Sequence, residues 1–367
     1  MRAAYWLKRL ALLSLLVSGC GNEITDTQYL QRARQHYAQG ELQASAIELQ
    51  NALRQNSANS EARQLLGEIY IRLGNGAVAE KVLMPILTAR QPAGGALTDL
   101  GKALLLQGKY REVLERIQIM DDFAIPDQAQ LHAVRGEAYL GLEEMDAARE
   151  EFRSTLRLQP DAETALIGLT RLAGALGQLA EMQELLGKLL AKAPDSSQAW
   201  SLQGDYYRYK KDLDKAEEAY TKAIASSPYN KVDYLSRAWV RTDKRDVKGA
   251  AADVDIYIKW FPDSPDGYFI RGILALQEGR YEDAYVFLTE VLNRNPDYMP
   301  AIFYLGQVSF AQKKYEQAQK YLNTYLWHDP DSSETMKKLA IIYINQKDYQ
   351  KAQAVLEQPA LFDSLSG

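Results

Sequence analysis

The chain repeats one arrangement of small, apolar and polar positions about every 34 residues, a period typical of stacked helical pairs. The eighth place of each interval holds a small residue: Ala33, Gly67, Gly101, Gly136, Thr170, Gly204, Ala238, Gly272, Gly306 and Ala340. The twentieth place is mostly alanine: Ser45, Ala79, Val113, Ala148, Met182, Ala216, Ala250, Ala284, Ala318 and Ala352. Small residues at both places let two paired helices approach closely, while larger residues such as Tyr220 and Leu322 fill the space around them. The pattern therefore predicts about ten helix-turn-helix repeats.

Six prolines follow the same interval: Pro160, Pro194, Pro228, Pro262, Pro296 and Pro330. A proline lacks the backbone N–H and clashes with the preceding helical turn, so each is expected to end the second helix of a repeat. The Asp-Ser pair after Pro194, Pro262 and Pro330 is expected to cap the next helix. In both small-residue series the step after the third repeat is longer by a single residue, and we expect a loop near Ile125-Pro126-Asp127 to absorb it.

The segment from Trp200 to Pro228, with Gly204, Tyr207 and Ala216 between them, carries a family resemblance. It resembles the tetratricopeptide repeat (TPR) pattern almost place by place, and the likeness extends over nearly the whole chain. The resemblance implies an all-α fold, a right-handed superhelical solenoid of about ten 34-residue repeats over residues 26–366. Repeat seven departs from the family pattern, because Arg237 and Arg241 occupy places that are usually apolar.

Residues 1–19 have the composition of a secretory signal, with Arg2, Lys8 and Arg9 ahead of a short apolar run. That run is too short to span a bilayer as a stable anchor. Val17-Ser18-Gly19-Cys20 resembles the bacterial lipobox, which implies that Cys20 is lipidated and becomes the N-terminus of the mature chain, with residues 20–25 as a tether. The alternative is a plain signal peptide with an incidental cysteine. Cys20 is the only cysteine, so lipidation would leave no free thiol in an oxidising compartment.

Charge and the residue after Cys20 refine the expected location. In Gram-negative bacteria an Asp after the lipidated cysteine favours the inner membrane, so Gly21 implies an outer-membrane anchor with the repeats in the periplasm. Loss of Arg2, Lys8 and Arg9 reduces the 43 basic residues to 40, against 48 acidic ones, which gives the mature chain a net charge of −8. An acidic chain of this kind lacks the electrostatic footprint of a nucleic-acid-binding protein.

The sequence shows no catalytic or metal-binding motif and implies no cofactor. His36, His132 and His328 lack metal-ligand spacing, and we interpret His36 as a core residue of repeat one. There is no phosphate-binding glycine loop, no GxSxG and no HExxH. Asp253 and Asp255 stand two residues apart on a predicted helix, which places them on different faces, and we interpret them as solvated. We therefore do not expect an enzyme.

The TPR resemblance implies that places two, five, six, nine, twelve and thirteen of each first helix line a concave surface. In the later repeats these places supply aromatic residues, and the candidate partner-binding residues are Tyr209, Trp239, Phe269, Phe303, Tyr304 and Phe310, with the polar neighbours Asp205, Arg208, Asp243 and Gln307. Inward aromatics are suited to gripping an extended peptide or to stacking on sugar rings. The alternative is that some of them pack between successive first helices.

A closer resemblance covers the N-terminal part of the chain, up to about Pro85. It is carried by Cys20-Gly21-Asn22 and by the segments Gln28–Ala33, Ile47–Leu53, Ala62–Tyr70 and Leu73–Ala77. These segments are similar to the opening of TPR lipoproteins associated with PEP-CTERM sorting and exopolysaccharide loci. The resemblance implies an envelope scaffold for protein partners of an export or sorting assembly. Direct binding of a glycan or peptide in the aromatic groove is the alternative.

Overall fold

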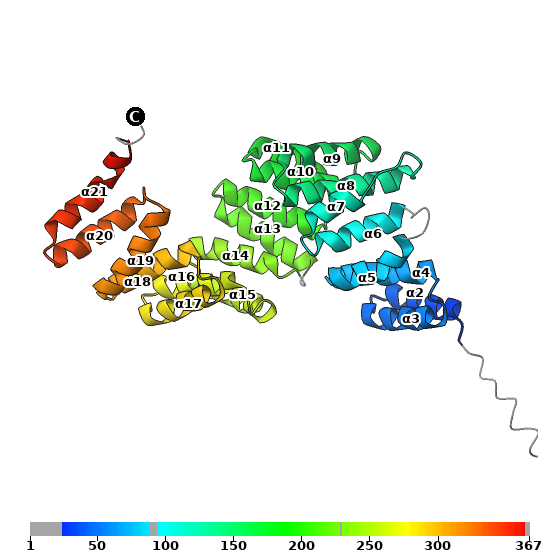
Figure 1. Ribbon diagram of the computed structural model, residues 1–367, viewed down its shortest axis with the longest axis horizontal. Helices are drawn as coiled ribbons and strands as arrows, with labels where there is room; N and C mark the ends of the chain where they lie inside the picture. Colours follow the sequence, from blue (N-terminus) through cyan, green and yellow to red (C-terminus); the bar gives the residue numbers. More distant parts are fainter. Residues whose placement is uncertain (1–23, 88–93, 228–229, 364–367) are drawn as a thin grey trace, which may run out of the picture. The chain divides into compact units, whose positions relative to one another are not determined.

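The computed structural model describes residues 24–87, 94–227 and 230–363, and all regular elements in these ranges are α-helices (Figure 1). The predicted signal peptide and Cys20 lie outside the described residues. The helices form two compact units, one up to Leu172 and one from Ala173. An array of repeats buries its apolar residues between neighbours, so it needs no single core. No helix within the described ranges is both long enough and apolar enough to cross a bilayer.

Even-numbered helices are the first members of the repeats and odd-numbered helices the second. The first unit contains α2 (Asp26–Ala38), α3 (Leu42–Gln55), α4 (Ser60–Arg72), α5 (Gly76–Leu87), α6 (Gly94–Leu105), α7 (Tyr110–Arg116), α8 (Ile125–Gly141) and α9 (Met145–Leu158). The helix α10 (Glu163–Ala175) begins in the first unit and ends in the second. The second unit continues with α11 (Leu179–Lys192), α12 (Ser197–Tyr209), α13 (Leu213–Ser226), α14 (Val232–Asp243), α15 (Val247–Trp260), α16 (Pro265–Gln277), α17 (Tyr281–Arg294), α18 (Met299–Ala311), α19 (Tyr315–His328), α20 (Ser333–Asn345) and α21 (Tyr349–Asp363).

The close approach of paired helices explains the two small-residue series. Every residue at the eighth and twentieth places is buried. A Cβ atom at Gly204 would lie 2.6 Å from the Tyr220 ring, and one at Gly306 would lie 2.6 Å from Leu322. Glycine is therefore needed where a large residue of the second helix crosses the first helix. The prediction of helix pairs held together at these places is confirmed.

Each first helix ends in a turn with one residue in the left-handed backbone region. Five of these residues are Gly40, Gly74, Gly108, Gly177 and Gly279, and the other five are Glu143, Lys211, Arg245, Lys313 and Lys347. The second helices end as the prolines predict, since α11, α15 and α19 have their C-caps directly before Pro194, Pro262 and Pro330. Ser196 and Ser264 cap the next helix by accepting backbone N–H bonds. Ser332 does not, because its hydroxyl lies 2.8 Å from Oγ1 of Thr335 instead.

The extra residue after repeat three is not in the predicted loop at Ile125–Asp127. These residues form the first turn of α8, where a proline fits because its missing N–H has no partner in the helix anyway. The irregular segment is residues 117–124, which follows the short helix α7. Gln128 fastens this segment by donating a 2.9 Å hydrogen bond from Nε2 to the Phe123 carbonyl.

Candidate protein-binding surface

The ten candidate binding residues all lie in the second unit, on first helices. Asp205, Arg208 and Tyr209 are on α12, Trp239 and Asp243 on α14, Phe269 on α16, and Phe303, Tyr304, Gln307 and Phe310 on α18. The repeat pattern thus brings residues far apart in the sequence onto neighbouring helices of one unit. They do not all have the same environment.

Four of the aromatic residues form a continuous array across α14, α16 and α18. The ring centroids of Trp239 and Phe269 are 5.8 Å apart, those of Phe269 and Tyr304 are 5.6 Å apart, and those of Tyr304 and Phe303 are 5.4 Å apart. Phe303 also packs on Tyr325 of its own repeat, with a centroid distance of 4.7 Å. Tilted and edge-to-face contacts of this kind stabilise each pair beyond simple area burial. The array therefore joins repeats seven, eight and nine.

Phe269 is a packing residue in this array. Its side chain is only 4% exposed, and its ring also meets Tyr298 at 5.2 Å. Phe269 belongs to one apolar cluster with Ala301 and Leu305 of the next first helix. We therefore correct the sequence interpretation and remove Phe269 from the residues available to a partner. Trp239, Phe303, Tyr304 and Phe310 are half-buried and keep part of their surface open.

Two apolar residues at inner places are largely exposed. Tyr209, at the end of α12, is 50% exposed, and Val232, at the start of α14, is 54% exposed. Val232 was not among the candidates because the sequence argument selected aromatic residues. Val232 occupies the second place of repeat seven, which is one of the places expected to line the concave surface, so its position in the repeat could have identified it. Tyr209, Val232 and half-buried Trp239 therefore leave apolar surface open on α12 and α14.

The polar candidates differ in how far they are already engaged. Asp205 accepts a 2.7 Å hydrogen bond from the Tyr220 hydroxyl and lies 3.6 Å from Arg208. Asp243 is exposed and Gln307 is half-buried. Burial raises the pKa of Tyr304, and the nearby carboxylates of Glu334 and Asp243 raise it further. Asp243 is therefore the candidate carboxylate most open to a basic group on a partner.

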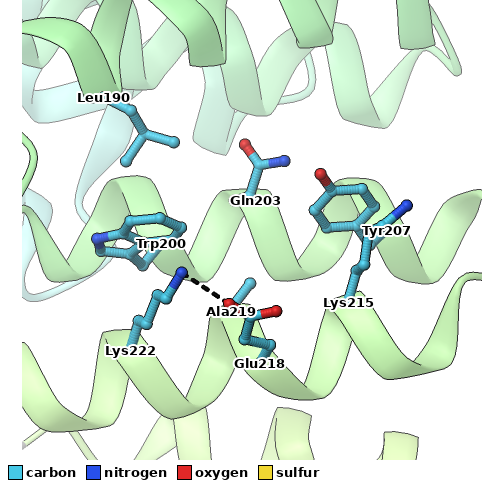
Figure 2. Close-up of a pocket in the computed structure, with 8 residues that line it drawn as sticks. All are labelled: Leu190, Trp200, Gln203, Tyr207, Lys215, Glu218, Ala219 and Lys222. Atoms are coloured by element: carbon cyan, nitrogen blue, oxygen red, sulfur yellow. Dashed lines mark ion pairs between the residues drawn. The ribbon is translucent and has the colours of Figure 1, made fainter.

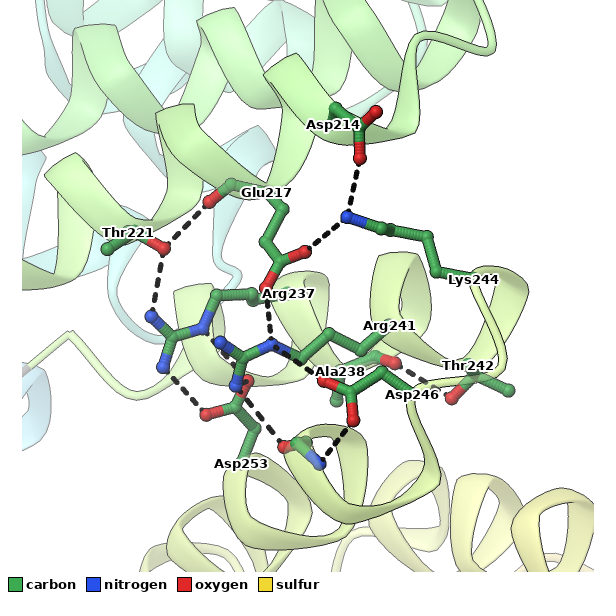
Figure 3. Close-up of polar contacts among 11 residues, drawn as sticks. Asp214, Glu217, Thr221, Arg237, Ala238, Arg241, Thr242, Lys244, Asp246 and Asp253 are labelled. Carbon is green, nitrogen blue, oxygen red and sulfur yellow. Dashed lines mark hydrogen bonds and ion pairs between the residues drawn. The ribbon is translucent and has the colours of Figure 1, made fainter.

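A buried ionic network lies between repeats six and seven (Figure 3). Asp253 on α15 accepts hydrogen bonds from Arg237, at 2.7 and 2.9 Å, and from Arg241, at 2.9 Å. Arg241 also donates a 2.8 Å bond to Glu217 on α13, and Lys244 donates another 2.8 Å bond to Glu217. Burial raises the pKa of Glu217, but the bonds from Lys244 and Arg241 outweigh burial and hold that pKa below its ordinary value.

This network corrects the interpretation of Asp253 and explains the unusual arginines. The Asp253 side chain is 3% exposed and therefore not solvated, whereas Asp255 is 63% exposed and pairs with Arg271. Arg237 and Arg241 replace apolar packing at the seventh and eleventh places with ion pairs to neighbouring helices. The sequence held a signal, because repeat four has Arg135 and Glu151 at the places of Arg237 and Asp253, and these two residues also pair at 2.8 Å.

A cavity of about 430 Å³ opens beside repeat six (Figure 2). Trp200, Gln203 and Tyr207 of α12 face Lys215, Glu218 and Lys222 of α13, with Leu190 of α11 at one side. The ammonium of Lys222 lies 4.3 Å from the Trp200 ring centroid and 2.8 Å from Glu218. Trp200 and Tyr207 stand at places where the TPR pattern has packing residues. Lys222 lies over the Trp200 ring and Lys215 over the Tyr207 ring, so the chain's own side chains occupy the space above both rings.

Two of the three histidines, His36 and His132, contact a glutamate. His36 is half-buried and its Nδ1 lies 2.6 Å from Glu41, so it is not the core residue that the sequence suggested. His132 contacts Glu151, also at 2.6 Å, beside Arg135. Over the described ranges, no group of three His, Cys, Asp or Glu side chains could hold a metal ion.

Comparison with known families gives a consistent result over most of the chain. One tetratricopeptide repeat model matches residues 30–84, 98–163, 168–231 and 235–298, and a second matches residues 275–334. Among curated proteins, the human mitochondrial import receptor subunit TOM70 is 21% identical over 248 residues. That match covers 64% of this chain and 40% of TOM70, so the chain spans less than half the length of this relative.

Two solved structures support the same fold. PilW, described as a widely conserved type IV pilus biogenesis factor, superposes with a TM-score of 0.52 and 15% identity, covering 58% of this chain and 97% of PilW. PilF of Pseudomonas aeruginosa gives a TM-score of 0.51 and 14% identity, covering 63% of this chain and 98% of PilF. At these identities the likeness concerns the fold alone.

Proposed function

We propose that this chain, which belongs to the tetratricopeptide repeat family, is a scaffold that binds a partner protein on the inner surface of repeats six to nine. We define this inner surface by the residues Tyr209, Val232, Trp239, Asp243, Phe303, Tyr304, Gln307 and Phe310. The observation that carries the proposal is the exposure of Tyr209 and Val232, with part of Trp239, at places that the tetratricopeptide repeat resemblance assigns to the concave surface. Aromatic and aliphatic side chains that stay exposed in this way offer contact area to a protein partner.

The partner class follows from the chemistry of the inner surface. Its residues are apolar and aromatic, with one exposed carboxylate, Asp243, and one amide, Gln307. A protein segment with apolar side chains would bury that surface, and a basic side chain on it would pair with Asp243. A sugar platform is less well supported, because the rings of the array meet one another at their edges and faces instead of presenting a row of free faces.

The proposed location is the cell envelope. The lipobox-like segment ending at Cys20 would attach the chain to the outer membrane by lipid, with the repeats in the periplasm. The similarity to PEP-CTERM and exopolysaccharide-associated lipoproteins supports a role in an export or sorting assembly. The names of TOM70 and PilW refer to mitochondrial import and to type IV pilus biogenesis, and we extend to this chain only the general idea of binding protein partners.

Site-specific crosslinking in cells tests the inner surface. A photoreactive residue at position 209 or 232 is expected to capture the same defined partner, and Trp239→Ala is expected to reduce that capture strongly. Trp327→Ala is the matched control, because Trp327 is 86% exposed on the second helix α19 and should leave capture unchanged. Absence of any crosslinked protein at both positions would contradict the proposal. Retention of a glycan by the purified chain, lost in Trp239→Ala, would favour the alternative.

The lipid anchor has an independent test. Mass spectrometry of the N-terminal peptide is expected to show an acylated Cys20, and Cys20→Ser is expected to release the chain from the membrane fraction. Separation of inner and outer membranes then tests the role of Gly21. An unmodified Cys20 in the mature chain would refute the anchor and leave the inner-surface proposal standing.

We propose no catalytic role for this chain. Within the described ranges, the buried charged clusters at Asp253 and Glu151 consist of ion pairs between helices. Turnover of any substrate by the purified chain would overturn this part of the proposal.

A further inference from the structure

The cavity beside repeat six contains a polar side chain that the fold does not use (Figure 2). Gln203 lies between Trp200 and Tyr207 on α12 and points into the space between their rings. Its amide makes no hydrogen bond within the part of the chain that the structure describes. Gln203 also occupies the seventh place of its repeat, which is usually apolar. A half-buried amide in this position can both donate a hydrogen bond to a ligand and accept one from it.

Two lysines are held beside the cavity by the same aromatic rings. The ammonium of Lys222 lies 4.3 Å from the Trp200 ring centroid, and that of Lys215 lies 5.4 Å from the Tyr207 ring centroid. The Trp200 indole is itself fixed, because its Nε1–H donates a 2.8 Å hydrogen bond to the Pro194 carbonyl. Attraction to the rings restricts both lysine side chains. The two ammoniums are therefore in position before a ligand arrives, and a cavity of about 430 Å³ remains next to them.

The charge of the lining favours an anionic ligand. It carries two ammoniums, those of Lys215 and Lys222, and one carboxylate, that of Glu218. Glu218 pairs with Lys222 at 2.8 Å, and Lys215 pairs at 2.8 Å with Asp212, outside the lining. An ammonium has three N–H donors, so one internal ion pair leaves donors for a ligand. The cavity is thus a locally positive site on a chain with a net charge of −5.

Repeat five has the same ion pair without the rest of the site. Lys188 and Glu184 occupy the places of Lys222 and Glu218, and they pair at 2.6 Å. The rings, the amide and the second lysine are missing there, since the places of Trp200, Gln203, Tyr207 and Lys215 hold Leu166, Leu169, Ala173 and Glu181. The combination is therefore a feature of repeat six and not a general consequence of the repeat pattern.

We propose that this cavity binds an extended acidic segment of a partner protein, with one carboxylate at each lysine and a peptide group at Gln203. Lys215 and Lys222 are seven residues apart on α13, so they lie on one side of the helix and about 10 Å apart along it. Three residues of an extended chain also span about 10 Å, so acidic residues at i and i+3 match the two ammoniums. The Gln203 amide complements a peptide group, because both contain N–H donors and a C=O acceptor.

The cavity is distinct from the inner surface. Its lining comes from the second helices α11 and α13 and from the side of α12 that faces α13, and it includes no residue of the inner surface as defined above. Leu190 and Ala219 provide apolar contact for the side chains between the two carboxylates. The volume lies within the usual range of sites that enclose a small ligand, so it suits a few residues of a peptide.

Isothermal titration calorimetry with the purified full chain tests the proposal. The probe is the peptide acetyl-Gly-Ser-Glu-Ala-Leu-Glu-Ser-Gly-amide, for which saturable binding is expected. Lys222→Met is expected to weaken binding about tenfold, because it removes a charge-assisted hydrogen bond. Glu218→Gln is expected to strengthen binding, because it frees Lys222 from its internal partner. Gln203→Leu introduces the repeat-five residue and is expected to weaken binding without unfolding the repeat.

Lys188→Met is the matched control. It removes the same charge and the same kind of ion pair from the equivalent place one repeat earlier, so peptide binding should stay nearly unchanged. The same peptide with glutamine in place of both glutamates is expected not to bind. Trp239→Ala should also leave peptide binding unchanged, so failure here is separable from failure of the inner-surface proposal.

Three results would overturn the proposal. The first is no saturable binding of the acidic peptide, or binding that Lys222→Met and Lys188→Met weaken equally, which would indicate diffuse attraction. The second is equal binding of the glutamine peptide, which would show that the carboxylates are not recognised. The third is tighter binding of tri-galacturonic acid that competes with the peptide and depends on Lys222, which would assign the cavity to an acidic glycan.

Discussion

Asp253→Ala is expected to destabilise the junction of repeats six and seven, because it removes the anion shared by two buried arginines. Arg237 is 12% and Arg241 19% exposed in their side chains, and both donate to Asp253. After the substitution Arg241 keeps its hydrogen bond to Glu217. Arg237 keeps only its hydrogen bond to Thr221 and its contact with the face of the Tyr234 ring. An uncompensated cation would then remain in a site with little access to water.

The size of the effect follows from this geometry. Removing one partner of a buried ion pair costs about 3–5 kcal/mol of stability. We expect the lower end, about 3 kcal/mol, because Arg241 keeps one partner and both guanidinium groups have some access to water. A loss of that size corresponds to a roughly 100-fold faster exchange of amides that open through the junction. Hydrogen exchange with mass spectrometry on peptides from α13, α14 and α15 is the suitable assay, since a repeat array does not necessarily unfold in one step.

Asp255→Ala provides the matched control on the same helix. Asp255 is 63% exposed and its pair with Arg271 lies at the surface, so its loss is expected to cost less than about 1 kcal/mol. Replacing Arg237, Arg241 and Asp253 together by Leu is expected to restore stability to the wild-type level or above, because no charge is then left buried without a partner. Equal exchange rates in Asp253→Ala and Asp255→Ala would refute the reasoning.

Three further predictions concern single positions, each measured as the change in hydrogen exchange of the peptides around the substituted residue. Gly204→Ala is expected to lower stability by about 1–3 kcal/mol, because the new Cβ would lie 2.6 Å from the Tyr220 ring. Gly187 lies in a helix with open space around it, so Gly187→Ala is expected to raise stability by up to about 1 kcal/mol. Equal shifts for the two would contradict the packing argument. Lys211→Gly is expected to gain about 0.5 kcal/mol by relieving a φ of 58°, and a loss would show that Lys211 has another role. Burial raises the pKa of Asp233 above 3.8, so ionisation of its carboxyl group reduces the stability of the folded chain at neutral pH. Asp233→Asn is therefore expected to be more stable than wild type at pH 7. This difference in stability should vanish as the pH falls below 3.8, where the carboxyl group is protonated in both the folded and the unfolded chain.

The parts of the fold that the sequence predicted depend on contacts that recur in every helical repeat. The eighth place is small in every repeat and the twentieth in most of them, where two helices cross, and the prolines stand where a second helix must end. Ten copies of the same constraint make such a pattern visible in a single sequence. The loop after repeat three was misplaced because the shortening of α7 to residues Tyr110–Arg116 occurs once and leaves the spacing of the small residues almost intact.

The candidate site was harder to predict, because burial there depends on two neighbouring repeats at once. Phe269 and Trp239 both occupy inner places, but the next first helix covers Phe269 and leaves Trp239 half open. Asp253 looked solvated from its own helix, and only the arrival of Arg237 and Arg241 from α14 buries it. Residues of this kind are assigned correctly only when the facing helix is considered together with their own.

The three leucines at the twenty-fourth place of repeats eight, nine and ten separate the two kinds of information. Leu288 and Leu322 are fully buried and Leu356 is half exposed, although all three follow an alanine by four residues on a second helix. Their shared identity reflects the helix pair, which the sequence encodes locally. Their different exposure reflects the next helix, which stands over two of them and not over the third. A repeat pattern thus specifies every interface as if a neighbouring helix were present, and the exposure of the residue shows whether that helix is there.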